Sequence, residues 1–355
     1  MLLSDVYLWL SCSRVPTQKI NRLLDRMSPV QLWESFSSDG KYLLDEKTFS
    51  MLKRTRSVDF IERAKQYLET NNVKYVTRVD PIYPTALAQR EVDPPPVLYY
   101  KGDLDIVREP CLAVVGTRRA SQYGKYAVNR IVSELAGSFT VVSGLAAGID
   151  GYVHAATLEN GGKTVAVLGS GLFNPSPVSN LRIFDEICAN GLVLSEYTPE
   201  THASVYTFPQ RNRIISGLSK GVLVVEADER SGSLITVRCA LEQGRDVFAV
   251  PGDIDKPRSR GTNKLIKNGA TAVTSAQDIF DYYSVSSPNK KSESKMLALD
   301  FSEQQVLDIL SQGEKSFDDL VETCGMTVPE LNTALSALMI YGLIHERSKN
   351  LYCIS

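Results

Sequence analysis

Apolar residues recur at helical spacing in the first part of the chain. The segments 6–10, 20–24, 30–33 and 60–68 each show this spacing, and short polar breaks separate them. We therefore predict a small helical domain over residues 1–79. A Pro-rich passage at 80–109 is predicted to be an ordered, extended connector, because proline fixes φ and cannot donate a hydrogen bond to a sheet.

From residue 111 the pattern changes, and short β-branched runs alternate with amphipathic segments. Strands are predicted at 111–115, 140–143, 164–168, 192–195, 222–225, 247–250 and 272–274. Helices are predicted between them, at 123–135, 150–158, 181–189, 212–219, 234–243 and 262–268. Near-continuous apolar strands alternating with helices indicate an α/β fold with a doubly wound, mostly parallel sheet. We assign it to residues 110–283 as a Rossmann-like domain.

The last part of the chain predicts a linker and a small domain. Residues 284–298 are polar and rich in Ser and Lys, which is typical of a flexible linker. Residues 299–355 follow as three predicted helices, at 302–310, 316–324 and 328–341, and a β-ribbon whose hairpin tip is at 348–350. This order predicts a C-terminal winged helix.

Composition and charge exclude several kinds of protein. The net charge of the 355 residues is −2, and the six Cys and three His are scattered without a Cys-x-x-Cys pair. This usage is typical of a reducing cytoplasm and of a chain without a zinc site. No leader pattern opens the chain, and no apolar run is long enough to cross a bilayer. We expect a cytoplasmic protein with no cofactor, no metal and no membrane partner.

Several predicted strands end in loops that suit an anion. Glycine lets a ligand approach the backbone, and helix N-termini present free N–H groups. Because ligands of open α/β sheets bind at the carboxyl ends of the strands, neighbouring loops could hold successive phosphates of one nucleic-acid strand. The candidate phosphate-binding residues are Gly116, Thr117, Arg118, Arg119, Ser143, Gly144, Gly148, Gly169, Gly171, Asn180, Arg182, Arg211, Asn212, Arg213, Ser231, Gly232 and Ser233.

The same loops argue against common enzyme sites. The loop 116–121 lacks the Gly-x-Gly-x-x-Gly of a dinucleotide fold, and Gly162-Lys-Thr164 precedes a strand and lacks the first glycine of a P-loop. We interpret His154 as a structural histidine and Asp150 as the N-cap of its helix. Glu196 and Glu226, each at a strand end, are expected to form salt bridges with nearby arginines. We expect no catalytic residue.

Together these segments resemble the DprA/Smf family of DNA-processing proteins. The resemblance covers residues 80–283 strongly and the two terminal regions more loosely, the first as a SAM-like or helix-hairpin-helix-like domain. The motifs that carry it include Gly116-Thr-Arg118, Ser143-Gly-Leu-Ala-x-Gly-Ile-Asp150, Phe208-Pro-x-Arg-Asn-Arg-Ile-Ile-Ser-Gly-Leu-Ser219, Ser231-Gly-Ser-Leu-Ile-Thr236 and Gly244-Arg-Asp-Val-Phe-Ala-Val-Pro-Gly252.

The resemblance implies a single-stranded-DNA-binding protein that is not an enzyme. Such a protein protects incoming DNA in natural transformation and loads the RecA recombinase onto it. It implies a homodimer formed through the Rossmann-like domain, and single-strand-binding protein is a further candidate partner. The family's strand-binding basic residues correspond to Arg118 or Arg119 and to Arg182. The stretch 174–180 lacks the family's Tyr-Pro pair, which leaves a base-stacking role of Phe173 open.

Two other functions are weighed against this one. A nucleotide-processing enzyme of the lysine-decarboxylase-like (cytokinin-activating) family would share the fold, but its Pro-Gly-Gly-x-Gly-Thr motif is missing at 230–236. A protein-interaction scaffold is the third alternative for the function.

Residues 299–355 carry 3 Lys/Arg and 9 Asp/Glu, a net charge of −6, and 328–341 has no Lys or Arg. We therefore expect the winged helix to bind protein, or the strand-binding domain of its own or a neighbouring chain, instead of duplex DNA.

Overall fold

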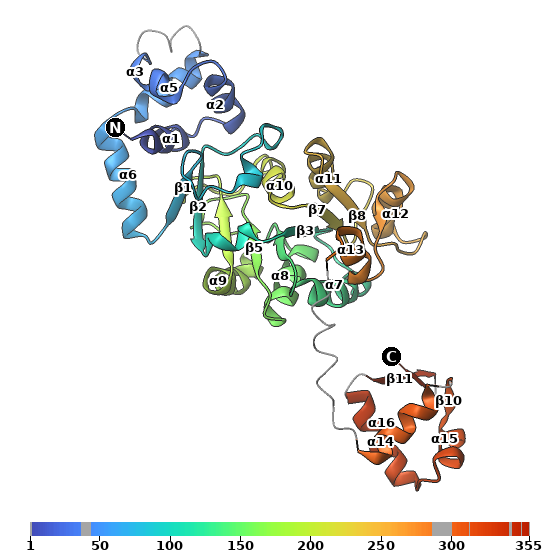
Figure 1. The fold of residues 1–355 in the computed structure, drawn as a ribbon. Helices are drawn as coiled ribbons and strands as arrows, with labels where there is room; N and C mark the ends of the chain where they lie inside the picture. The colour runs from blue at the N-terminus through green and yellow to red at the C-terminus, as the bar shows by residue number, and fades with distance from the viewer. Residues whose placement is uncertain are drawn as a thin grey trace. The chain divides into compact units, whose positions relative to one another are not determined.

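The computed structural model of the chain describes residues 2–36, 44–285, 300–311, 313–340, 343–348 and 350–354 (Figure 1). It divides into two compact units, Met1–Pro288 and Asn289–Ser355, each of which is described by itself. The predicted linker at 284–298 lies almost wholly outside the described residues.

A nine-stranded sheet forms the centre of the first unit, as far as the structure describes it. Seven neighbouring strands are parallel, which confirms the predicted doubly wound sheet. In spatial order the strands are β1 (Lys74–Thr77), β2 (Val97–Gly102), β6 (Leu192–Ser195), β5 (Thr164–Val167), β4 (Thr140–Ser143), β3 (Cys111–Val115), β7 (Gly221–Val224), β8 (Asp246–Ala249) and β9 (Thr271–Ala272).

The strand order reverses beside β3. The chain first adds β4, β5 and β6 on one side of β3, then returns to place β7 on its other side, where Ala113 pairs with Val222. The connections that follow β3 and β7 therefore leave the sheet in opposite directions. This is the topological switch point, at which open α/β sheets form a crevice at the carboxyl ends of the strands.

Helices cover both faces of the sheet, and alternate residues of β3 show how. Leu112 and Val114 share a buried cluster with α7 and α8, whereas Ala113 and Val115 share one with α10 and α11, because successive side chains of a strand point to opposite faces. The helices of this region are α7 (Gln122–Leu135), α8 (Ile149–Glu159), α9 (Leu181–Asn190), α10 (Thr207–Leu218), α11 (Ser233–Glu242), α12 (Pro257–Lys267) and α13 (Ala276–Tyr283).

Two helices begin five residues earlier than the sequence pattern predicted. Helix α10 starts at Thr207 instead of residue 212, and α12 starts at Pro257 instead of residue 262. In each case a proline, Pro209 or Pro257, lies in the first turn. Proline is tolerated there because the N–H groups of the first turn have no partner within the helix.

The Pro-rich passage contributes a strand that the prediction missed. Strand β2 pairs antiparallel with both β1 and β6, and Val97–Tyr100 are buried. The prolines end at Pro96, immediately before the strand, so they remove no hydrogen bond from it. The rest of the passage holds three short 3-10 helices, η1 (Thr85–Leu87), η2 (Arg90–Val92) and η3 (Leu104–Arg108).

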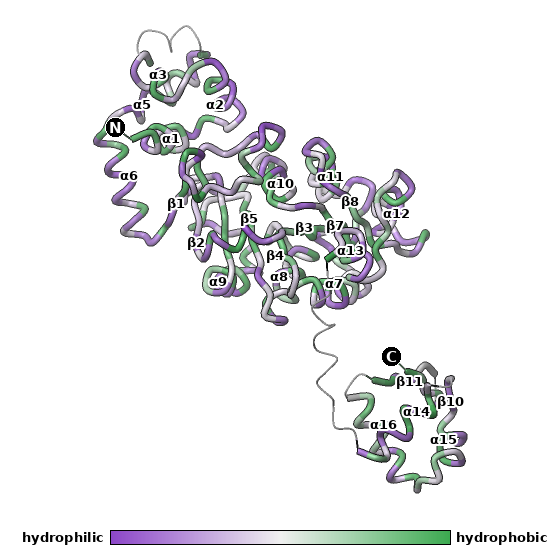
Figure 2. Tube along the Cα trace, in the orientation of Figure 1, coloured by the Kyte–Doolittle hydropathy of each residue, from purple (hydrophilic) through white to green (hydrophobic). Residues whose placement is uncertain are grey.

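The N-terminal helices pack around Trp9. Its indole ring lies edge-on to Trp33 and Phe36, with ring centroids 5.0 and 5.6 Å away, and its Nε1 donates to Leu52 O. Ser11 and Tyr99 share a hydrogen bond of 2.9 Å that joins these helices to β2. Figure 2 shows hydrophobic residues along the central strands and largely hydrophilic ones along the outer helix α6. The described helices here are α1 (Leu3–Cys12), α2 (Thr17–Leu24), α3 (Pro29–Glu34), α5 (Glu46–Thr55) and α6 (Val58–Thr70).

The second unit is a winged helix, as predicted. It carries the three expected helices and the β-ribbon, and a short additional strand, β10, pairs with β12. Residue 349, in the predicted hairpin tip, and residue 341, at the predicted end of the last helix, lie outside the described residues. The elements are α14 (Phe301–Leu310), β10 (Lys315–Ser316), α15 (Phe317–Cys324), α16 (Val328–Ile340), β11 (Ile344–Ser348) and β12 (Leu351–Ile354). In neither unit does a described helix have the length and apolar character needed to cross a membrane.

Candidate nucleic-acid interface

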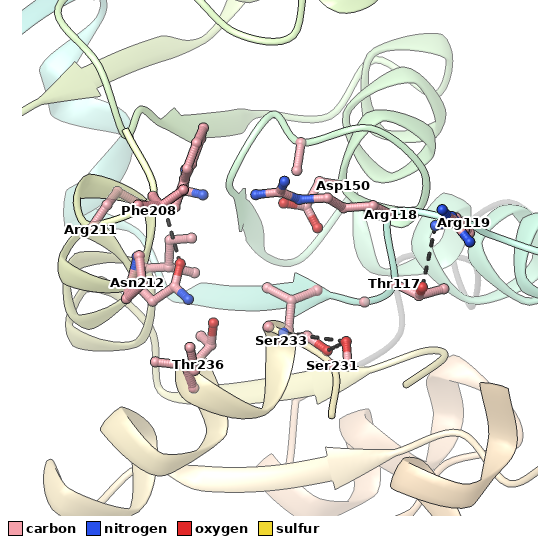
Figure 3. Close-up of a pocket in the computed structure, with 18 residues that line it drawn as sticks. Thr117, Arg118, Arg119, Asp150, Phe208, Arg211, Asn212, Ser231, Ser233 and Thr236 are labelled. Atoms are coloured by element: carbon pink, nitrogen blue, oxygen red, sulfur yellow. Dashed lines mark hydrogen bonds between the residues drawn. The ribbon is translucent and has the colours of Figure 1, made fainter. Parts of the chain in front are cut away.

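A cleft of about 540 Å³ opens at the switch point of the sheet (Figure 3). The connections after β3 and β7 and the first turns of α10 and α11 form most of its walls, and Ala146 and Asp150, which follow β4, complete the lining. Nine of the seventeen predicted contact residues line it: Gly116, Thr117, Arg118, Arg119, Arg211, Asn212, Ser231, Gly232 and Ser233.

The connection after β3 is held rigidly against β7. Thr117 N donates to Glu226 O over 2.8 Å, and a Cβ on Gly116 would lie 2.6 Å from the Ile149 side chain. The Glu226 carboxylate accepts from Ser121 N and Ser121 Oγ, at 2.9 and 2.5 Å. The expected salt bridge of Glu226 with an arginine is therefore wrong, because the N-cap serine of α7 occupies both of its oxygens.

Arg118 and Arg119 lie on this rigid connection with their side chains exposed. Neither forms an ion pair within the described parts of the chain. The Arg118 guanidinium carbon lies 4.9 Å from the centroid of the Phe208 ring, and Figure 3 shows the Arg119 side chain pointing the opposite way. The cleft thus has two positive charges available to a ligand.

The opposite wall is the start of α11. Gly232 is the N-cap of this helix, and no atom lies within 4 Å of the position that a Cβ would take there, so the backbone is open to the cleft. Ser231 Oγ and Ser233 Oγ share a hydrogen bond of 2.8 Å beside it. Hydroxyl groups and the positive end of a helix dipole both suit an anion.

Arg211 lies at the floor of the cleft and is only 4% exposed. Its Nη1 donates to Gly144 O over 2.7 Å and to Val167 O, and its Nε donates to Asn212 Oδ1. Because α10 begins at Thr207, Arg211 follows one full turn into the helix and meets the strand ends instead of solvent. Burial lowers the pKa of Arg211 to about 10, and the negative charge of Asp150 opposes this shift.

Asp150 and His154 are buried behind the cleft. The N-cap of α8 is Gly148, at φ +79°, so the prediction that Asp150 is the N-cap is wrong. Asp150 lies in the first turn instead, where its Oδ2 accepts from Gly144 N over 3.2 Å. Burial raises the pKa of this carboxyl, and the Arg211 charge opposes the rise.

His154 is a structural histidine, as predicted. It is fully buried, and its Nε2 accepts from Leu145 N over 3.3 Å. Its Nδ1 lies 2.7 Å from Thr164 Oγ1, a hydroxyl that itself donates to Val141 O. These partners fix the neutral form with the proton on Nδ1, and burial lowers the pKa to about 3.

The other eight predicted contact residues do not line this cleft. Several hold the loops in place: Ser143 Oγ donates to Val114 O, and Asn180 Nδ2 donates to Leu145 O and Ala146 O. Glycines make room for neighbours, since a Cβ on Gly144 would lie 2.4 Å from the Arg211 guanidinium. The eight are Ser143, Gly144, Gly148, Gly169, Gly171, Asn180, Arg182 and Arg213.

Two of these eight are arginines engaged by carboxylates. The exposed Arg182 pairs with Glu186 over 3.0 Å, one turn further along α9. Arg213 pairs with Glu196 over 2.5 Å, and both side chains are nearly buried, which confirms the salt bridge expected for Glu196. Thr17 Oγ1 donates to the same Glu196 oxygen and so joins α2 to the end of β6.

The main residue that sequence reasoning missed is Phe208. It is the second residue of α10, it lines the cleft, and its ring packs on Gly169, where a Cβ would lie 2.7 Å from the ring. A prediction that began this helix at residue 207 would have included Phe208 among the candidate contact residues. Phe173, by contrast, lies edge-on to Tyr67 and beneath Lys101, and it does not line this cleft. Among the described residues, no three His, Cys, Asp or Glu side chains gather in a way that could hold a metal ion.

Two family models match this chain. The one described as DNA recombination-mediator protein A matches residues 74–284, and the DprA winged helix domain matches residues 291–348. The chain is 49% identical over 201 residues to the DNA processing protein DprA of Streptococcus pneumoniae, covering 57% of this chain and 71% of that one. It is 39% identical over 295 residues to protein Smf of Escherichia coli, covering 80% and 78%.

Solved structures agree with these sequence matches. The X-ray structure of S. pneumoniae DprA superposes with a TM-score of 0.70 at 38% identity, covering 79% of this chain and 98% of that one. DNA processing protein A of Helicobacter pylori, which is described for its single-stranded DNA binding mode, superposes with a TM-score of 0.53 at 29% identity, covering 59% and 95%. The chain belongs to the DprA/Smf family of DNA-processing proteins.

Proposed function

We propose that this chain binds single-stranded DNA through the cleft at the switch point and leaves the strand chemically unchanged. The observation that carries the proposal is the pair Arg118 and Arg119, both exposed and both without an ion-pair partner among the described residues. Both residues line the cleft together with the start of α11 at Gly232, so cationic side chains and the positive end of a helix dipole border one space. The H. pylori relative, described for its binding of single-stranded DNA, supports the same ligand.

The charge around the cleft also favours a phosphate. Residues 110–283 carry 17 Lys/Arg and 16 Asp/Glu, so attraction must come from a local arrangement of charges. Asp150 is the one carboxylate among the described lining residues, and it is buried, hydrogen-bonded to Gly144 and opposed by Arg211. Among the residues that line the cleft, little negative charge therefore faces a strand that lies between Arg118 and Ser233.

The test is the affinity for oligo-dT over a series of salt concentrations. Each neutralised phosphate of a single strand contributes about 0.7 to the slope of log affinity against log salt. The double variant Arg118→Ala/Arg119→Ala should bind more weakly and lose about 1.4 of that slope. The matched control is Arg108→Ala, an exposed arginine just before β3, at the end of that strand away from the cleft. Unchanged affinity in the double variant would reject this cleft as the binding site.

We further propose that the chain acts in natural transformation as a homodimer in the cytoplasm. It would protect incoming strands and load RecA onto them, with single-strand-binding protein as a second partner. Membership of the DprA/Smf family supports this proposal. RecA filament assembly on a strand coated with single-strand-binding protein should be faster with the wild type than with Arg118→Ala/Arg119→Ala. Light scattering coupled to size exclusion tests the dimer.

The absence of a catalytic step is a separate proposal. His154 has both ring nitrogens engaged in hydrogen bonds and is neutral, so it is not available as an acid or base in the cleft. The chain also lacks the Pro-Gly-Gly-x-Gly-Thr motif of the lysine-decarboxylase-like enzymes at 230–236. Incubation with nucleoside monophosphates should release no free base. Release that depends on protein concentration would favour the enzyme alternative.

For the winged helix we propose a protein partner. Helix α16, the second of the two helices that would form a helix-turn-helix, carries no Lys or Arg between Val328 and Ile340. A helix that reads the major groove needs such residues to meet the phosphates. The chain shortened to residue 285 should therefore match the full chain in its affinity for duplex DNA. Loss of a strongly salt-dependent duplex affinity on shortening would contradict this.

A further inference from the structure

We propose that a groove beside helix α6 binds a short acidic peptide segment of a partner protein that carries a large apolar side chain. The groove has a volume of about 410 Å³ and lies between α6 and the loop that follows β6. It shares no lining residue with the cleft at the switch point, so the inference does not depend on the proposed binding of DNA. A volume of this size is typical of ligand sites.

The inside of the groove is apolar and uncharged. Helix α6 contributes Phe60, Ala64 and Leu68, which lie on one face of the helix because they are spaced by four residues. The hydroxyl of the buried Tyr99, which also lines the groove, is already hydrogen-bonded to α1 over 2.9 Å. Burial raises the pKa of Cys12 to about 11, so the thiol beside Tyr99 is neutral. A large apolar side chain could therefore enter the groove without burying an unpaired charge.

Two arginines border this groove and are available to a partner. Arg14 and Arg63 are exposed, and none of the ion pairs within the described ranges of the chain includes either of them. Glu200 is the one carboxylate among the described lining residues, and it accepts a hydrogen bond from the Tyr67 hydroxyl, which raises the pKa of Tyr67. The border of the groove is therefore positive on balance, and the complementary charge on a partner is negative.

The groove is preformed and has the length of a short extended segment. From Phe60 to Leu68 the helix rises about 12 Å, the length of about four residues of an extended chain. Lys65 ties α6 to α1 through a salt bridge of 2.7 Å. On the other wall, Phe173 N donates to Pro199 O over 3.0 Å and so fixes the loop after β6. Because both walls are held in place, a ligand need not order them on binding.

The chemistry of the groove favours a peptide over a nucleic-acid strand. A nucleic-acid strand gains much of its affinity from many cationic contacts, whereas the charged residues that line this groove are two arginines and one glutamate. An apolar centre with a charged border is instead the usual make-up of a protein interface. The partner is therefore a protein segment in which acidic residues flank a large apolar residue.

The test is an array of immobilised pentapeptides that is incubated with the fluorescently labelled full chain. Each pentapeptide has Phe, Trp, Leu or Ala at its centre, and either Asp and Glu or Lys and Arg around the centre. We expect binding to the acidic peptides with a central Phe, Trp or Leu, and little binding to those with a central Ala or with basic flanks. Binding to no peptide, to all of them equally, or to the basic ones alone would overturn the proposal.

Variants then locate the binding site of the best peptide by fluorescence anisotropy. Arg14→Gln/Arg63→Gln should lose about tenfold in affinity, the effect of two exposed charge contacts. The matched control is Arg26→Gln/Arg54→Gln, which removes the same charge from exposed arginines of the N-terminal helices that do not line the groove, and it should bind as the wild type does. Equal losses in the two double variants, or no loss in the first, would overturn the proposal.

Two further variants separate this groove from the cleft. Ala64→Trp should fill the groove and abolish peptide binding; if it fails to fold, the exposed arginine variants still decide the question. Arg118→Ala/Arg119→Ala should bind the peptide as the wild type does, and a loss there would assign the peptide to the cleft and overturn the proposal. Arg14→Gln/Arg63→Gln should keep its affinity for oligo-dT. A failure of the wild type to bind oligo-dT would therefore reject the proposed function and leave the peptide result unaffected.

Discussion

The guanidinium of Arg211 and the carbonyl oxygen of Gly144 lie 2.7 Å apart, which joins the first turns of α10 to the end of β4. The same guanidinium also reaches Val167 O at the end of β5. Arg211 therefore holds three segments of the cleft together and has few donors left for a ligand. Its geometry makes it a positioning residue beneath the binding surface.

Arg211→Ala should be strongly destabilising. Two carbonyl groups and the buried Asp150 would lose their cationic partner, and removing one member of a buried charged pair costs about 3 kcal/mol or more. Arg211→Lys should be intermediate, because one ammonium group cannot reproduce both the Nη1 bonds to the two carbonyls and the Nε bond to Asn212. Chemical denaturation measures both. If Arg211 contacted phosphate, Arg211→Lys would instead keep its stability and lose affinity for oligo-dT.

Gly144→Ala and Gly232→Ala should behave in opposite ways. A Cβ at Gly144 would lie 2.4 Å from the Arg211 guanidinium, so we expect a destabilisation of about 1–3 kcal/mol. At Gly232 no atom lies within 4 Å, so stability should stay within about 0.5 kcal/mol while the added methyl weakens oligo-dT binding. Thermal unfolding and binding titrations on the two variants check this. Equal stability losses would contradict the assignment of Gly232 to an open surface.

His154 should make the folded state lose stability as the pH falls. Its pKa is lowered by burial from 6.5 to about 3, so between these values the unfolded chain binds a proton that the folded chain does not. This group alone therefore contributes a loss of about 1.4 kcal/mol per pH unit as the pH falls through that window. Asp150 acts in the opposite direction. Its pKa is raised in the folded state, so below that pKa the folded chain binds a proton that the unfolded chain does not, and this group alone then adds stability as the pH falls toward its ordinary pKa.

The difference between wild type and His154→Asn isolates the histidine contribution. Asparagine has no proton to gain, so the free energy of unfolding of the variant should fall less steeply between pH 6 and 4. Urea titrations at several pH values give both slopes. Parallel slopes would mean that His154 titrates in the folded state.

The Arg213–Glu196 pair should show strong coupling in a double-mutant cycle. Both side chains are nearly buried, at 12% and 3% exposed, so Arg213→Met leaves the Glu196 carboxylate buried without its ion-pair partner. We expect Arg213→Met to cost about 3–5 kcal/mol, and Arg213→Met/Glu196→Gln to cost less than Arg213→Met alone. Unfolding free energies of the variants measure the coupling. Additive losses would show that the pair contributes no mutual stabilisation.

The sequence pattern predicted the parallel strands well because they are buried on both faces and so are apolar at almost every position, as in Cys111–Val115. It missed β2, since three prolines next to a strand are the usual sign of a connector. It placed α10 five residues too late, because Pro209 in a first turn resembles a break.

That one boundary error changes the interpretation of the site. With the helix beginning at residue 212, Arg211 would lie at an exposed helix start; with the helix beginning at Thr207, Arg211 is buried and Phe208 lines the cleft. The role of two glycines was also predicted wrongly. Gly144 and Gly169 were expected to admit phosphate, but the structure shows Arg211 and Phe208 beside them. Sequence alone cannot distinguish room made for a ligand from room made for the chain's own side chains.

The antiparallel strand β2 also determines where the chain can be cut. Its backbone is hydrogen-bonded to β6 from Tyr99 to Gly102, and β1 covers its other side. A chain that began at residue 110 would leave one side of β6 with unpaired N–H and C=O groups, and such an edge pairs readily with the strands of other molecules. The smallest piece that stays monodisperse in solution should therefore begin before Lys74, well outside the parallel core that carries the cleft.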